Sequence, residues 1–166
     1  MDAPPPVFRA PMRSRLASVP DDRAAVARAL ELGLVGVGGR LDPVPHDLAA
    51  AVAALAAPPA PDERAARRLA RFAAAPLGSF VWTTDAAGAL HLGRVTGPWR
   101  YDPSAAAHAV DLVHVRDAEW LPRPVDDADA PAAVHETMSR GGRNWQSITR
   151  MAAGERTAVL WEALRG

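Results

Sequence analysis

Short apolar runs and turn residues alternate most clearly in the middle of the chain. Residues 77–84 and 90–95 are two such runs, and the segment between them contains Asp85 and Gly88. Apolar runs on either side of a glycine-bearing turn are typical of a β-hairpin. Residues 99–101 follow at once and are expected to be a third extended piece. The pattern therefore predicts a small curved sheet within residues 78–101.

Before this hairpin, the pattern predicts strands alternating with helices. Each helix is expected to begin at an aspartate and to end at glycine or proline, as N-terminal caps and C-terminal breakers do. The expected elements are a strand at 7–10, a helix from Asp21 and Asp22 to Gly33, a strand at 34–37 and helices starting at Asp47 and Asp62, after a loose lead-in at 1–6.

After the hairpin, we expect a strand at 109–116 that 119–121 continue or pin, a surface loop at 122–131, a short helix at 132–139, an ordered segment at 144–148 and a last helix at about 155–164. This order of elements predicts an α+β fold, with a small mixed or antiparallel β-barrel flanked by helices. The length of 166 residues suits a single domain. Its core is expected at 7–121, with a C-terminal helical extension at 132–165.

Composition narrows the classes of function. The chain carries 19 acidic and 19 basic residues, all of the latter arginine, so its formal net charge is +0 and no overall field attracts nucleic acid. The absence of cysteine excludes disulfides, and the absence of lysine argues against phosphate-binding P-loops and Schiff-base catalysis. No apolar run approaches the ~18 residues of a membrane span, so we expect a cytoplasmic protein without a membrane partner.

Motifs for catalysis are missing. The five histidines are scattered singly, and no Gly-x-Ser-x-Gly motif is present. Only His108, Asp111 and His114 cluster, and alternation along the expected strand would turn Asp111 away from both histidines. The glycines of residues 36–39 lack the third glycine of a dinucleotide-binding loop, so we interpret them as a tight bend or close backbone approach. We therefore expect no enzyme activity, no metal and no cofactor.

Aromatic side chains around the hairpin favour binding instead. Trp82, Trp99 and Tyr101 lie on or beside it, and bases stack on such rings. A tryptophan in a strand also commonly fills the interior, so the core alternative stays open for all three. Trp120 and Trp161 are assigned to the core.

Arginines next to glycines or turns are candidate phosphate ligands, because guanidinium and backbone N–H groups approach an anion closely there. Each of them alone is also compatible with a solvent-facing charge. The candidates are Arg13 and Arg15 in the first loop, Arg40 after the glycines, Arg94 and Arg100 near the hairpin, and Arg140 and Arg143 around the second glycine pair.

The helix expected after Asp62 carries a further basic stripe on one side. Its members, at three- and four-residue spacing, are Arg64, Arg67, Arg68 and Arg71. Such a stripe fits either a solvated helix face or a phosphate-binding surface.

Several motifs together resemble the EVE-like branch of the PUA superfamily. They are Gly-Ser-Phe-Val-Trp-Thr at 78–83, Leu-Gly-Arg-Val-Thr-Gly-Pro-Trp-Arg-Tyr at 92–101, Asp-Leu-Val-His-Val-Arg at 111–116, and Glu119-Trp120. The glycine-containing strand at 34–38 is similar to the one that precedes these motifs in that branch. The resemblance covers residues 7–121.

This resemblance implies a small barrel with a pocket for a nucleobase, often a methylated one, flipped out of a duplex or taken from a single strand. By position, Trp82 and Thr83 would lie near the pocket, with Trp99 and Tyr101 on the neighbouring strand. Gly38 and Gly39 would form the opposite wall, where many relatives carry a tryptophan in place of the second glycine. Ser79 replaces the usual aspartate, and Trp120 would be structural.

The leading hypothesis is a noncatalytic reader of nucleic acid, specifically of modified DNA bases. As such it would be a specificity module in a restriction or phage-defence system, with a nuclease or another effector as partner. The alternative is a protein-interaction or small-ligand module that has the same barrel but does not read bases; the neutral net charge and Gly39 favour it.

Overall fold

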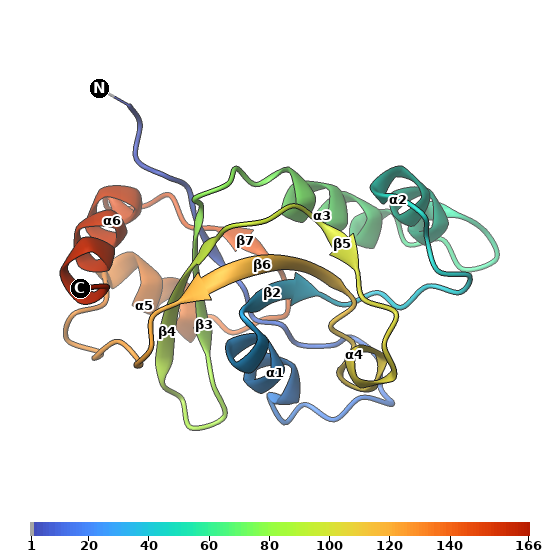
Figure 1. Cartoon of the computed structure of the whole chain (residues 1–166), viewed down its shortest axis with the longest axis horizontal. Coiled ribbons are helices and arrows are strands. Elements are labelled where there is room, and N and C mark those ends of the chain that lie inside the picture. Colours follow the sequence, from blue (N-terminus) through green and yellow to red (C-terminus); the bar gives the residue numbers. More distant parts are fainter. Residues whose placement is uncertain (1) are drawn as a thin grey trace.

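The computed structural model describes residues 2–166 and is an α+β fold in which helices flank a curled mixed sheet (Figure 1). The strands are β1 (Val7–Arg9), β2 (Leu34–Val37), β3 (Phe80–Thr84), β4 (Leu90–Val95), β5 (Arg100–Tyr101), β6 (His114–Trp120) and β7 (Gln146–Ser147). The helices are α1 (Ala24–Leu32), α2 (Leu48–Ala56), α3 (Glu63–Ala74), α4 (Ala105–Val110), α5 (Ala132–Ser139) and α6 (Ala153–Leu164).

Strand β6 connects the two parts of the sheet. The strands run in the order β2-β6-β4-β3-β1-β7, and β5 also pairs with β6. The start of β6 pairs with β5, and its end pairs with β4. Strand β2 pairs with residues 114–117 of β6. Only β1 and β3 are parallel among the paired strands of residues 2–166. The sheet curls into a half-barrel. This confirms the expected α+β fold, in which helices flank a curved mixed sheet.

Side chains of β3 alternate between two apolar cores. Phe80 and Trp82 face the core that contains Trp161 of α6, whereas Val81 faces the core that contains Phe72 of α3. This is the alternation that an extended strand imposes on successive side chains. In Figure 1, α5 and α6 lie together at one end of the sheet, and α2 and α3 lie beside each other at another. The strand thus separates two helical layers.

A buried arginine joins β6 to the end of α3. Arg116 is 3% exposed, and its guanidinium donates to the carbonyl oxygens of Phe72 at 3.0 Å, Ala75 at 2.7 Å and Gly97 at 2.9 Å. These carbonyls include ones that a helix C-terminus leaves without an intrahelical partner. Arg116 therefore fixes where α3 ends against the sheet.

Helix boundaries follow the expected caps. Asp47 accepts from the backbone N–H of Ala50 at 2.7 Å and Asp62 from that of Ala65 at 2.9 Å, which confirms both N-caps. Gly33 ends α1 in the left-handed conformation with φ 68°. The strand at 34–37 and the helix at 132–139 are confirmed. Residues 2–6 carry no regular structure, and Met1, also in the expected lead-in, lies outside the described residues.

One expected element is corrected and two are located more exactly. The strand expected at 109–116 is wrong in its first part, because Ser104 caps a helical alanine run, α4 extends to Val110 and β6 begins only at His114. Helix α1 begins at Ala24, whose N–H donates to the carboxylate of Asp22 at 3.0 Å, while Asp21 is bonded to Arg13. The third extended piece is present as β5, and it pairs with β6. Within the part of the chain that the structure describes, no helix is long and apolar enough to cross a membrane.

Candidate functional site

A cleft of about 420 Å³ lies between the end of β2, helix α3 and the loops that follow β1 and precede β7. This volume falls within the ~300–1,000 Å³ range of small-ligand sites. Its charged lining residues are Arg13, Arg15, Arg40, Arg68, Arg143, Asp62 and Asp111. Five arginines against two aspartates make this cleft, called the arginine cleft below, locally cationic in a chain of zero net charge.

The backbone at Gly38 and Gly39 forms part of the cleft wall and is held by two buried side chains. Asp111 accepts from the N–H of Gly39 at 3.0 Å, and His114 donates its Nε2 proton to the carbonyl oxygen of Gly39 at 2.8 Å. Gly39 has φ 120°, a conformation that favours glycine. A Cβ at residue 38 would lie only 2.4 Å from Asp111 Oδ2, so this close approach requires glycine.

His114 is neutral in this arrangement, and its tautomer follows from its partners. The indole N–H of Trp99 is only a donor, so it must donate to Nδ1 of His114, at 3.2 Å, which leaves the proton on Nε2 for Gly39. Burial lowers the pKa of His114 to about 4, against smaller raising effects from Gly39 and Asp111. A fixed neutral imidazole is therefore part of the support of the cleft wall.

The opposite wall is a loop that hydrogen bonds tie to the rest of the cleft. Ser14 donates to Asp111 Oδ2 at 2.6 Å, and Arg143 donates to the carbonyl oxygen of Ser14 at 2.7 Å. Arg15 donates to the side chain of Asn144. Asp111 thus receives hydrogen bonds from both walls and sets the distance between them.

Two buried N–H groups of cleft residues have no acceptor among residues 2–166. They are Nε of Arg40 and Nε1 of Trp145. The indole of Trp145 is 5% exposed, stacks on Phe8 with 4.6 Å between ring centroids, and meets the edge of Phe72. A buried donor without an acceptor is costly, so a ligand with oxygen acceptors would gain by binding here.

Positive charge at the cleft exceeds the negative charge of Asp62 and Asp111, the two carboxylates that line it. Within the described chain only Arg13 of the five cleft arginines forms an ion pair with a carboxylate, that of Asp21. Burial lowers the pKa of Arg68, and Arg15 lowers it further, while Asp62 raises it. An anion in the cleft would relieve this repulsion.

The structure brings together six of the site residues expected from the sequence. Gly38, Gly39, Arg13, Arg15, Arg40 and Arg143 all line the arginine cleft. They come from three loops that are distant in the sequence, as expected if several loops met at one mouth of the barrel.

The hairpin aromatics lie elsewhere. Trp82 and Thr83 have no exposed surface, and the indole N–H of Trp82 donates to Thr157 of α6 at 3.4 Å, on the side of the sheet away from α3. Tyr101 receives a hydrogen bond from the N–H of Leu41 at 2.9 Å, next to Arg40, and burial raises its pKa. Trp99 and Tyr101 thus support the cleft from behind rather than line it.

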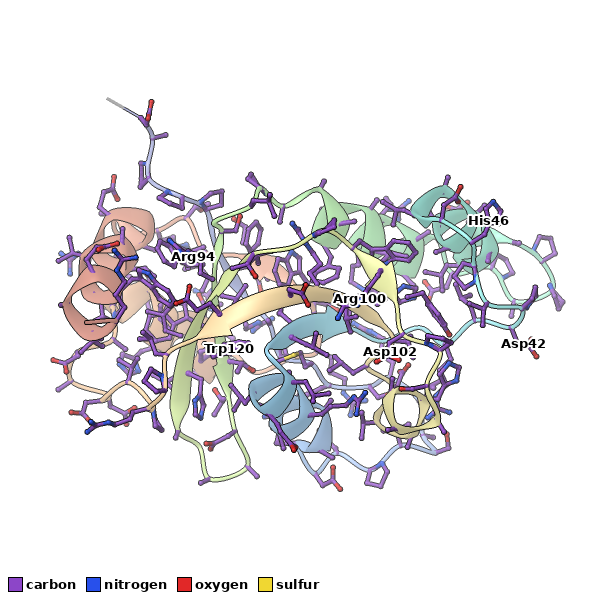
Figure 2. All side chains as sticks on the ribbon, in the orientation of Figure 1. Asp42, His46, Arg94, Arg100, Asp102 and Trp120 are labelled. Carbon is purple, nitrogen blue, oxygen red and sulfur yellow. The ribbon has the colours of Figure 1, made fainter. Side chains whose placement is uncertain are left out.

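Arg94 and Arg100 are outside the cleft as well. Arg94 lies over the ring of Trp161, 5.3 Å from its centroid, and Arg100 pairs with Asp117 at 2.9 Å. Figure 2 shows the first beside α6 and the second at β5. Trp120 is half-buried and donates to the carbonyl oxygen of Leu34 at 2.9 Å, in keeping with a structural role.

The sequence motifs did not assign three of the cleft residues to a common site. They are Trp145, Arg68 and Asp111. The sequence signal that could have identified Trp145 was its position shortly after the second glycine pair and Arg143. The tryptophan of the family pattern would be strained at residue 39, because φ is 120° there and its Cβ would lie 3.3 Å from His114 and 3.5 Å from Leu55. Trp145, from a different segment, is the aromatic residue of this cleft.

Comparison of the chain with family models, with curated proteins and with solved structures gives no match. Among residues 2–166, no three His, Asp or Glu side chains are grouped so that they would hold a metal ion. The polar and aromatic groups that line the cleft are its five arginines, the carboxylates of Asp62 and Asp111, the backbone of Gly38 and Gly39, and the indole of Trp145.

Replacing Gly38 by alanine tests the close approach to Asp111. We expect Gly38→Ala to lower the free energy of unfolding by about 1–3 kcal/mol, because the methyl group overlaps the carboxylate. Asp111→Gly keeps the left-handed backbone of residue 111 and removes the overlapping atoms. In urea denaturation, the double variant should lose about 1 kcal/mol less free energy of unfolding than the two single variants lose together. Strict additivity would contradict the contact; Gly38→Ala with the exposed Asp117→Asn serves as an additive control.

Acid titration tests the neutral state of His114. Its pKa is about 4 when folded and about 6.5 when unfolded, so the unfolded chain binds the proton first as pH falls. The contribution of neutral His114 to the free energy of unfolding is therefore complete above pH 6.5. It falls by about 3 kcal/mol as the pH is lowered to 4. His114→Gln should remove this component from the pH profile of unfolding, whereas the exposed His46→Gln should not. Parallel profiles for wild type and His114→Gln would show that His114 titrates normally.

Proposed function

We propose that the protein is a noncatalytic reader of nucleic acid that takes one unpaired base into the arginine cleft and holds the adjacent phosphates on its arginines. The observation that carries the proposal is the set of unpaired donors: the buried N–H groups of Arg40 and Trp145, together with guanidinium groups that lack carboxylate partners within residues 2–166. Unpaired donors of this kind favour a ligand that is anionic and rich in oxygen acceptors.

A nucleotide fits these requirements better than a simple anion. Guanidinium groups are planar, so they stack on flat rings as well as donate to phosphate. Gly38 and Gly39 are half-buried and line the cleft, and Asp111 and His114 fill the places where their Cβ atoms would stand. At these two residues a ring in the cleft would therefore meet backbone. Bringing an unpaired base from a single strand avoids the few kcal/mol that flipping it from a duplex costs.

The resemblance to EVE-like domains adds the proposal that the base is a modified DNA base, and that the reader gives specificity to a nuclease or another effector partner. In this account the base lies against Gly38, Gly39 and Trp145, not against Trp82. The half-barrel is compatible with a small barrel fold.

Binding of a fluorescent single-stranded DNA of about twelve nucleotides tests the proposal by anisotropy, with and without 5-methylcytosine. We expect affinity to fall steeply with salt. Arg40→Gln with Arg68→Gln should weaken binding by roughly tenfold or more at 0.1 M salt, because two phosphate contacts are lost.

Arg94→Gln with Arg100→Gln is the matched control, since it removes the same charge from outside the cleft. If both double variants lose the same affinity for the oligonucleotide, the arginine cleft is not its binding site. Binding that does not respond to salt would also contradict the proposal. Equal affinity for free deoxycytidine monophosphate and for the oligonucleotide would instead identify a small-ligand module. Equal affinity for methylated and plain DNA would remove the modified-base part.

A further inference from the structure

Arginines continue beyond the cleft along the outer face of helix α3. Arg68 lines the cleft, Arg64 lies one turn before it and Arg71 one turn after it. Residues three or four apart share one face of a helix, so these three side chains form a row. The buried residues of the helix, Leu69 and Phe72 among them, face the core on another side.

Arg64, Arg68 and Arg71, called the α3 row, have no carboxylate partner among residues 2–166. Arg67 lies on the same side of the helix, three residues from Arg64 and four from Arg71, but it differs from them because it pairs with Glu63 at 3.8 Å. The members of the row also repel one another: Arg71 and Arg64 both lower the pKa of Arg68. Uncompensated like charges along one surface favour a partner with regularly spaced negative charge.

We propose that the α3 row is the path of the nucleic-acid strand outside the cleft, with Arg64 and Arg71 holding backbone phosphates on either side of the nucleotide bound beside Arg68. The row is about 10 Å long, because seven residues of helix rise about 1.5 Å each. It therefore spans more than the single nucleotide that the cleft takes. This inference rests on the proposed function and adds the direction and the length of the bound strand.

The inference predicts a dependence on ligand length. A mononucleotide needs only the cleft, whereas an oligonucleotide also covers the α3 row. Arg64→Gln with Arg71→Gln should leave the affinity for deoxycytidine monophosphate unchanged. For a single-stranded DNA of about ten nucleotides, the same change should weaken binding by roughly 10- to 30-fold at 0.1 M salt and make the slope of log K against log salt shallower by about 1.4.

Arg123→Gln with Arg150→Gln is the control, because it removes two exposed charges that lie outside α3 and outside the arginine cleft. Circular dichroism and urea denaturation of each variant establish that the fold is kept. The path is overturned if both double variants weaken oligonucleotide binding equally or if neither does. In that case, continued sensitivity to Arg40→Gln with Arg68→Gln would leave the cleft as the binding site. No binding of the oligonucleotide by the unmodified protein would overturn the cleft and the path together.

Discussion

The contact between Asp111 and the glycine pair at the end of β2 determines the shape of the candidate site. One carboxylate accepts from the N–H of Gly39 and from the hydroxyl of Ser14, so it joins the two walls of the cleft. His114 holds the other side of the same residue, because it donates to the carbonyl oxygen of Gly39. Because Asp111 lies against residue 38 too closely for a side chain, the wall is bare backbone. The cleft opens where glycine was required for packing.

Charge is then concentrated at the cleft by topology rather than by composition. The chain is neutral overall, yet loops after β1, β2 and before β7 converge with α3 and bring five arginines to one place. Much of the opposite charge lies outside the cleft, where Asp117 and Glu119 pair with Arg100 and Arg94. Asp62 lines the cleft and also caps α3. A protein with no net field can in this way present a strongly cationic recess, which makes salt dependence informative about its partner.

Local signals were sufficient for most elements and for part of the site. Caps such as Asp47 and Asp62 act within one turn, so sequence alone places them. The end of α4, residues 109–110, was expected to begin a strand, because the alternation along 109–116 was considered and the cap at Ser104 was not. Trp82 illustrates what sequence cannot decide: its alternation is clear, but which face of β3 meets α6 depends on tertiary packing. Trp145 joins the cleft only because β7 pairs with β1.

The central claim is the location of the ligand, and the indole N–H resonance of Trp145 reports on it most directly. Its proton has no acceptor among residues 2–166, whereas that of Trp82 is bonded to Thr157 on the other side of the sheet. Two-dimensional ¹H–¹⁵N NMR during titration with single-stranded DNA should shift the Trp145 indole and the amides of Gly38 and Gly39, and leave the Trp82 indole in place. Shifts confined to Trp82 and Thr83, or no shift at Trp145, would contradict the account.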